Sequence, residues 1–282
     1  MGIINNKAII YNNSKSFFWA SRFLSRNILK KVVNIYTFCR FHDDLVDEGV
    51  TLGSENEINE LTSTIKRYGI EDKIINELIS GISSDKNFKR YRSNKELLRY
   101  CYKVAGVVGI MMVQTIQIKA KEASYFAIDL GIAMQLTNIA RDVLEDYKKD
   151  RIYLPEDTNI NIETLGNLSR KNEIKIRNTV LKVLQMADTY YISSINGIRY
   201  IPFRSRFSIL VALRIYQAIG VKIKKTDTRF LHENIFITKK EKIFIIFKTI
   251  IEFIIFFIVP LYKKRHNAYL HKNLNGLEKI HE

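Results

Sequence analysis

The spacing of apolar residues constrains this chain more than any other feature of its sequence. Over long segments, apolar side chains recur every three or four residues, as on one face of an α-helix, instead of alternating as in a strand. The 282 residues include only 3 prolines and 12 glycines, so few positions would interrupt such helices. The sequence therefore predicts an all-α protein, with helices over residues 15–25, 28–47, 55–80, 94–120, 123–150, 171–195, 204–225 and 239–258.

Length and composition indicate one globular unit. With 46% hydrophobic residues the chain can bury a sizeable core, and no segment has the composition of an interdomain linker. We therefore expect a single domain over residues 1–282. Cys39 and Cys101 stand in apolar or aromatic surroundings, which is typical of reduced core thiols, and the chain does not open with a secretory signal. Both observations predict a cytoplasmic protein.

The charge balance is strongly basic. There are 45 Lys and Arg against 29 Asp and Glu, a formal charge of +16, and such a field attracts nucleic acid, phospholipid surfaces or phosphorylated substrates. The basic residues form scattered patches and no recognised nucleic-acid-binding motif is present, so we expect no nucleic acid partner. A basic helical nucleic-acid-binding protein remains an alternative that the charge alone supports.

The segment 239–265 is the most apolar of the chain and ends in a basic cluster. Lys248 and Glu252 interrupt it, and the uninterrupted run 253–259 is far shorter than the ~20 residues of a spanning helix. Two interpretations stay open and are compatible. The helix packs on the domain, or its apolar side contacts lipid while residues 263–265 contact anionic headgroups, as in a peripheral membrane protein.

An acidic cluster interrupts the apolar pattern of the helix predicted over residues 28–47. In FCRFHDDLVDEG, Asp43 and Asp47 are four residues apart and share one helix face, with Arg40 three residues before Asp43. Two carboxylates at this spacing repel each other, and burial increases the cost. A divalent cation between them would remove the repulsion, although such a cluster taken alone is more often a solvated face.

A second polar stripe favours the cation. The helix predicted over residues 123–150 carries amide and carboxylate side chains along one face: Gln135, Asn138, Asp142 and Asp146. Mg²⁺ prefers oxygen ligands and is usually held by one or two carboxylates together with substrate phosphates. Neither stripe contains His or Cys, which argues against zinc.

We therefore predict two facing helices whose aspartate pairs hold Mg²⁺, or alternatively Mn²⁺, against a diphosphate. Arg40 and Arg141 stand beside these acids, and a guanidinium can bind two phosphate oxygens at once. The mixture of acidic and basic residues is thus explained by one anionic, metal-binding substrate.

Five segments, in order along residues 13–220, resemble landmarks of the squalene and phytoene synthase family. They are NSKSFFWASRFL, IYTFCRFHDDLVDE, YCYKVAGVVGIMM, LGIAMQLTNIARDVLEDYKKDRIYLP and IPFRSRFSILVALRIYQAIG, and QLTNIARDVLEDYKKDRIYLP is the most specific part. The resemblance implies an isoprenoid synthase fold, a single helical barrel around a central cavity. Two aspartate-rich helices would face each other at its mouth.

The resemblance also implies the reaction. Members condense two prenyl diphosphates head to head through a cyclopropylcarbinyl diphosphate. We expect two C20 geranylgeranyl diphosphates to give phytoene, as in carotenoid biosynthesis. Squalene, dehydrosqualene or hydroxysqualene from two C15 farnesyl diphosphates is the alternative, with NADPH needed only for squalene. A non-catalytic pathway scaffold is disfavoured by the intact aspartates.

Roles for individual residues follow from the same resemblance. The implied metal ligands are Asp43, Asp47, Asn138, Asp142 and Asp146, and the four aspartates form the catalytic set together with Tyr36 and Arg40. Substrate contacts are implied for Ser14, Lys15, Ser16, Tyr36, Arg40, Tyr102, Gln135, Asn138, Arg141 and Tyr216. Of these, Tyr102 and Tyr216 match tyrosines that reach the cavity.

Overall fold

The computed structural model describes residues 15–48, 55–86, 88, 90–259 and 262–281, and the regular elements in these segments are all helical, as predicted. The α-helices are α2 (Lys15–Ser21), α3 (Arg26–Glu48), α4 (Glu55–Lys66), α5 (Asp72–Ser83), α6 (Asn94–Cys101), α7 (Val107–Ile116), α8 (Lys121–Arg141), α9 (Val143–Tyr147), α10 (Ile162–Gly166), α11 (Arg170–Ser194), α12 (Phe203–Lys225) and α13 (Lys239–Ile258). Short elements join them: the π-helical turn η1 (Tyr102–Gly106) and the 3-10 turns η2 (Glu156–Thr158), η3 (Ile195–Tyr200), η4 (Arg229–Leu231) and η5 (Ala268–Leu274).

The helix predicted over residues 94–120 is divided by the π-helical turn η1 into α6 and α7, and two other predicted helices are broken by non-helical residues. The helix expected over residues 55–80 divides into α4 and α5 around Gly69, whose φ of 86° lies in the left-handed region that glycine adopts without strain. The helix expected over residues 123–150 stops at Asp142, which has φ −102° and ψ 15°, and resumes as α9. The second break therefore falls on a predicted metal ligand.

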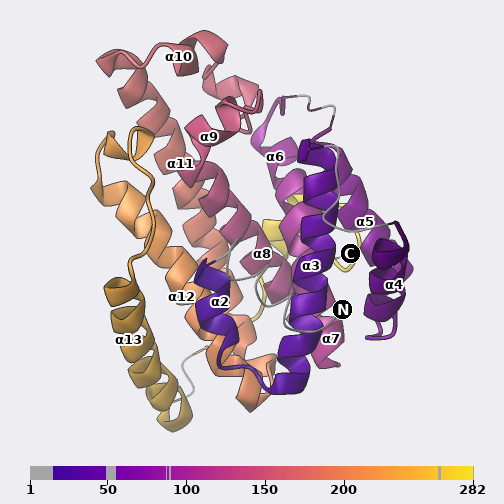
Figure 1. The fold of residues 1–282 in the computed structure, drawn as a ribbon. Helices are drawn as coiled ribbons and strands as arrows, with labels where there is room; N and C mark the ends of the chain where they lie inside the picture. The colour runs from indigo at the N-terminus through magenta and orange to yellow at the C-terminus, as the bar shows by residue number, and fades with distance from the viewer. Residues whose placement is uncertain (1–14, 49–54, 87, 89, 260–261, 282) are drawn as a thin grey trace.

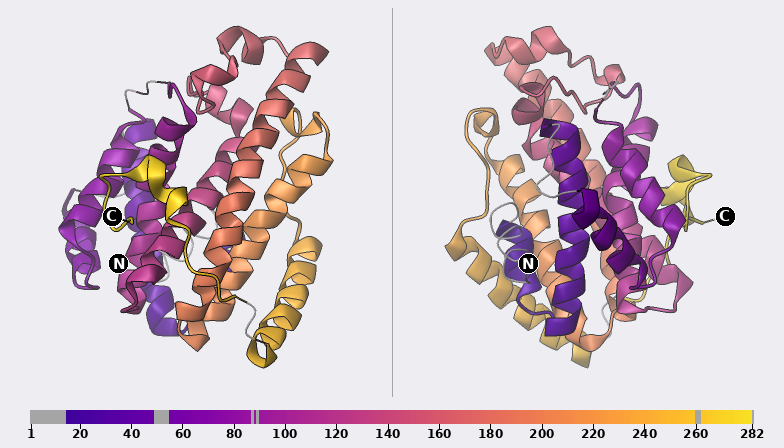
Figure 2. Two further views of the ribbon diagram at one scale, coloured as in Figure 1. Left: turned by 180° about the vertical axis from the view of Figure 1, so that it is seen from behind. Right: turned by 45° about the vertical axis from the view of Figure 1, so that its right-hand side comes forward.

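Helix α8 occupies the centre of the molecule (Figure 1). It packs against α11 and α12 on one side and against α7 and η1 on the other. Helix α3 also contacts α7, and α13 covers the outer side of α12. The last described segment, residues 262–281, returns behind α8, and its turn η5 packs against α6 (Figure 2, left).

A close approach of α8 to the η1–α7 segment depends on two glycines. A Cβ atom on Gly131 would lie 2.2 Å from the carbonyl oxygen of Ala105, and one on Gly109 would lie 2.2 Å from that of Ala127. The small residues of AGVVG therefore serve helix packing. A large contiguous cluster of buried apolar residues reaches from Ile35 to Ile280.

The helices enclose a cavity of about 330 Å³ beside α8. Its walls come from α3, η1, α7, α8, η3 and α12, and they are almost entirely apolar. Polar side chains line it where α8 approaches its C-terminal end: Tyr36, Gln135, Asn138 and Tyr216. An apolar pocket with a few convergent polar groups is the usual form of a small-molecule site.

Candidate active site

The polar end of the cavity contains an unsatisfied hydrogen-bond acceptor. The Asn138 amide donates from Nδ2 to Gln135 Oε1 at 3.4 Å, and Asn138 Oδ1 is buried without a hydrogen-bond donor among the described residues. A buried acceptor without a donor costs free energy, roughly 1–3 kcal/mol, which a cation or a donor from a ligand would recover. This oxygen thus fits a ligand position.

Asp43 lies two turns beyond Tyr36 on α3 and is held in an unfavourable environment for a charge. Burial raises the pKa of its carboxyl to about 7, and the neighbouring carboxylates of Asp47, Asp85 and Asp44 add to the effect. Arg40 opposes the shift without cancelling it. This carboxyl is therefore partly protonated at neutral pH in the absence of a cation.

Arg40 forms its ion pair with Asp44 and not with Asp43. Only 3% of Asp44 is exposed, whereas the Arg40 side chain retains 32% exposure. The sequence left Asp44 without a role, and the structure gives it one, which is to anchor Arg40 beside the acidic group.

Two basic residues connect Asp47 to the segment that follows α9. Arg151 donates from Nη1 to Asp47 Oδ1 at 2.7 Å, and Lys149 Nζ donates to Asp47 Oδ2 at 3.1 Å. Burial would raise the pKa of Asp47, but these hydrogen bonds outweigh it and hold the pKa below its usual value.

The second acidic group lies at the junction of α8 and α9. Arg141 binds the carboxylate of Asp142 with both arms of its guanidinium, at 2.7 Å and 2.5 Å. Burial, and after it the charges of Asp142 and Glu145, raise the pKa of Asp146 to about 8. Asp146 is thus a second carboxyl that is mostly protonated at neutral pH unless a cation accompanies it.

The two acidic groups face each other across shared basic residues. Lys149 and Arg151 form ion pairs with Asp47, and the same two cations oppose the rise in the pKa of Asp146. Carboxylates from α3 and from the α8–α9 junction therefore surround one region. It lies about one helical turn beyond Cys39 and Asn138, which line the cavity, whereas the four predicted aspartates do not line it themselves. Buried carboxylates whose negative charges are costly without a cation suit divalent metal ions. The neighbouring Arg and Lys side chains suit the phosphate oxygens of a diphosphate bound with those ions.

Not every predicted site residue reaches this region. Tyr102 is fully buried in the core, does not line the cavity, and donates its hydroxyl hydrogen to the carbonyl oxygen of Glu278 at 2.6 Å. The expectation that Tyr102 reaches the cavity is therefore wrong in this structure, because its hydroxyl is hydrogen-bonded to the C-terminal segment instead. Ser14 lies outside the described residues, and Lys15 and Ser16 begin α2 with side chains that are not described.

Asp85 is a member of the acidic group that the sequence did not single out. Its Oδ2 accepts a hydrogen bond from the Tyr100 hydroxyl at 2.7 Å, and its Oδ1 is buried and has no donor within the described segments. Arg151 donates to its backbone carbonyl at 3.3 Å, and burial raises the pKa of its carboxyl. Asp85 follows α5 in a loop, where no helical periodicity could mark it.

This all-helical fold around an apolar cavity, with two acidic groups near the cavity's polar end, is the isoprenoid synthase fold. The family model described as squalene/phytoene synthase matches residues 51–241, and the chain belongs to this family.

Similar proteins cover most of the chain. A phytoene synthase of Pseudescherichia vulneris is 32% identical over 248 residues, which is 76% of this chain and 79% of that protein. A 15-cis-phytoene synthase of a Paracoccus species is 30% identical over 272 residues, 86% and 88% of the two chains. A crystal structure of a dehydrosqualene synthase in complex with ligand has a TM-score of 0.75 at 24% identity, and the match covers 88% of this chain and 95% of that one. That structure shares the isoprenoid synthase fold predicted here.

Proposed function

We propose that this protein condenses two geranylgeranyl diphosphates head to head, through a cyclopropylcarbinyl diphosphate, to phytoene. Head-to-head prenyl condensation is the activity of the family, and several similar proteins are named phytoene synthases. The dimensions of the cavity favour the C20 chain length.

The extent of the cavity along α8 carries the proposal. Its lining begins at Asn138, beside the acidic groups, and continues along the same helix to Ala123. Fifteen residues of α-helix rise about 22 Å, which gives an extended C20 chain room behind its diphosphate. Apolar walls of this length also shield a carbocation from water.

The residues present fit Mg²⁺ at the polar end. Asp43, Asp47, Asn138, Asp142 and Asp146 would hold it, since each offers an oxygen and Asn138 Oδ1 has no other donor within the described part of the chain. Bound there, the metal would neutralise charge on the departing diphosphate.

The remaining polar residues would bind and orient the substrates. Arg40, anchored by Asp44, and Arg141, paired with Asp142, would donate to phosphate oxygens of the substrates. Tyr36 and Tyr216 lie where the diphosphate end of the cavity meets its apolar part. Their rings would flank the first carbons of the prenyl chain, where positive charge develops.

Product analysis tests the reaction and the chain length together. The purified protein is incubated with Mg²⁺ and either C15 or C20 prenyl diphosphate, with and without NADPH, and the extracted lipid is identified. We expect phytoene from the C20 substrate, independent of NADPH. A C30 product from the C15 substrate alone would assign the alternative, and no product from either substrate would refute the enzymatic proposal.

We further propose that α13 places the enzyme on a lipid surface. One side of α13 packs on α12, and its outer side exposes large apolar residues, each 41–59% accessible: Ile243, Phe244, Phe247, Ile250, Ile251, Ile254 and Ile255. Glu252, which interrupts the apolar pattern in the sequence, is turned inward and accepts from Arg214 Nε at 2.9 Å. No helix among the described residues is long and apolar enough to cross a bilayer.

The chemistry around this face favours lipid over a protein partner. Lys239, Lys240 and the exposed residues 263–265 place basic groups at both ends of the helix, where anionic headgroups would meet them. Both the C20 chain and a C40 hydrocarbon product partition into membranes. A bilayer is therefore the occupant we assign to the exposed side of α13.

Vesicle sedimentation checks this assignment. Phe247→Glu and Ile254→Glu should each weaken binding to anionic phosphatidylglycerol vesicles by about tenfold or more, because each removes a large apolar side chain from the bilayer. Ile192→Glu, at a 64% exposed position on α11, is the matched control and should bind like the original protein. Equal binding by all variants would contradict the role of α13.

A further inference from the structure

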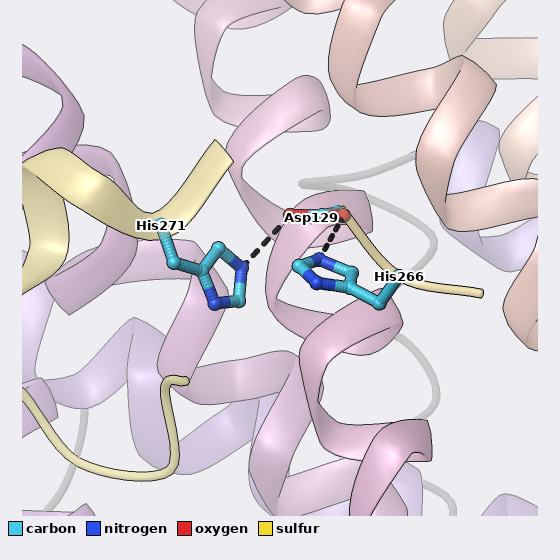
Figure 3. A group of neighbouring side chains, drawn as sticks. All are labelled: Asp129, His266 and His271. Carbon is cyan, nitrogen blue, oxygen red and sulfur yellow. Dashed lines mark hydrogen bonds and ion pairs between the residues drawn. The ribbon is translucent and has the colours of Figure 1, made fainter. Parts of the chain in front are cut away.

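A buried cluster of histidines and one aspartate lies on the side of α8 that faces away from the cavity. Asp129 belongs to α8 but is absent from the cavity lining, whereas His266 and His271 belong to the returning C-terminal segment. His266 Nε2 lies 2.9 Å from Asp129 Oδ2, and His271 Nε2 lies 3.0 Å from Asp129 Oδ1. Both imidazole rings approach the carboxylate from the same side, each pointing a nitrogen at a different oxygen (Figure 3).

The burial of this cluster is nearly complete. The side-chain exposure is 0% for Asp129 and 1% for each histidine. Burial alone would raise the pKa of Asp129, but the hydrogen bonds from His266 and His271 outweigh it and hold the pKa below its usual value. The carboxylate is therefore an anion in the protein interior, with imidazoles as its partners.

We propose that Asp129, His266 and His271 form a binding site for one transition metal ion of the Zn²⁺ type. The three ligand atoms lie within 4.8 Å of one another, so small side-chain rotations bring them to the bond lengths of about 2.0–2.2 Å that Zn²⁺ requires. Two imidazole nitrogens and one carboxylate oxygen suit Zn²⁺, whereas Mg²⁺ and Ca²⁺ prefer oxygen alone. The ligand set is thus different in kind from that of the acidic groups at the cavity.

The surroundings of the cluster resemble those of a metal-binding histidine pair. His281 Nε2 lies 2.8 Å from His266 Nδ1, so His266 can donate from Nδ1 while its Nε2 lone pair faces the metal. An outer hydrogen bond of this kind fixes the tautomer of a metal-binding histidine. His271 Nδ1 is buried without a hydrogen-bond partner among the described residues, which leaves Nε2 as its only anchored nitrogen.

The site would fasten the C-terminal segment across the back of the barrel. The same segment accepts hydrogen bonds from Tyr102 and Tyr190 through its carbonyl groups, at 2.6 Å and 3.0 Å. A metal joining residues 137 and 142 positions apart closes a long loop, so its effect should fall on stability. It lies on the far side of α8 from the substrate cavity and should leave the chemistry unchanged.

Metal analysis of the full-length protein, purified without a histidine tag, tests the site. After equilibration with Zn²⁺ and dialysis, we expect one zinc per chain by mass spectrometry, and a melting temperature that falls on chelation and returns with Zn²⁺ but not with Mg²⁺. His266→Ala and His271→Ala should lose the zinc. His232→Ala is the matched control, because His232 also contacts a carboxylate, that of Glu173, outside the cluster.

Two further measurements keep the test decisive if the alanine variants fold poorly. Co²⁺ added to the unmodified protein should produce visible absorption bands that Zn²⁺ removes, and Asp146→Asn should retain its zinc. Absence of zinc from the unmodified protein, or zinc that persists in His266→Ala and His271→Ala, would overturn the proposal. Zinc lost only from Asp146→Asn would place the ion at the cavity instead.

Discussion

Asp146→Asn should lower the rate of condensation by about 10²–10³-fold, because it removes a negative charge that would hold the metal against the leaving diphosphate. The amide keeps the shape of the side chain, so the cavity and the surrounding helices should not change. The measurement is turnover of C20 prenyl diphosphate at saturating Mg²⁺. A smaller deficit that disappears at high Mg²⁺ would indicate a weaker metal site and not a lost one.

The same substitution should make the metal-free protein more stable. The folded-state pKa of Asp146 is about 8, whereas an unfolded aspartate titrates near 3.9. Between these values the folded state holds a proton that the unfolded state has lost, so the stability of the original protein falls as the pH rises from about 4 to about 8. Asparagine cannot ionise, so the variant does not lose stability in this way. At pH 8 its free energy of unfolding should exceed that of the original protein by on the order of a few kcal/mol.

Thermal unfolding between pH 4 and pH 9 without divalent cations would reveal this gain. The difference between variant and original protein should be small near pH 4 and largest at about pH 8. Asp150→Asn is the matched control, since Asp150 is exposed and its φ of 58° suits both residues. If Asp146→Asn were inactive and also less stable at pH 8, the carboxyl would have a structural role and the metal assignment would fail.

Gly131→Ala should destabilise the protein strongly although it adds only one methyl group. The new Cβ would lie 2.2 Å from the carbonyl oxygen of Ala105, and this contact is with backbone that cannot rotate away. Helix α8 would have to move from η1, which costs about 1–3 kcal/mol or more, and the melting temperature should fall on the order of 5–10 °C. Gly131 and Ala105 also line the cavity, so we expect Gly131→Ala to lower the product yield as well as the melting temperature.

Gly220→Ala is the control for this experiment. Gly220 also lies inside a helix, α12, but the atom nearest to the methyl group that alanine would add is the flexible Cδ2 of Leu184, at 3.2 Å. Alanine is the better helix former by up to about 1 kcal/mol, so Gly220→Ala should be neutral or stabilising. Equal losses in both variants would show that helix geometry, and not the contact with Ala105, decides the effect.

The sequence predicted the features that depend on neighbours along the chain. Helix periodicity located nearly all of the long helices, and the four-residue spacing of Asp43 and Asp47 placed them on one face of α3. The stripe of Gln135 and Asn138 was likewise predicted, and both residues line the cavity. These inferences succeed because residues three and four apart in a helix are always close in space.

Contacts between residues far apart in the chain could not be derived from the sequence. Asp85 joins the acidic group from a loop, and Asp47 forms ion pairs with residues more than 100 positions away. The Tyr102 hydroxyl donates a hydrogen bond to the backbone carbonyl of Glu278. Likewise, nothing along the chain links Asp129 to two histidines near its end. The helices and the acidic pairs were thus determined by the sequence alone. Which side chains meet was decided by the packing of the helices around α8, because burial and long-range contacts set the charge and the partners of each group.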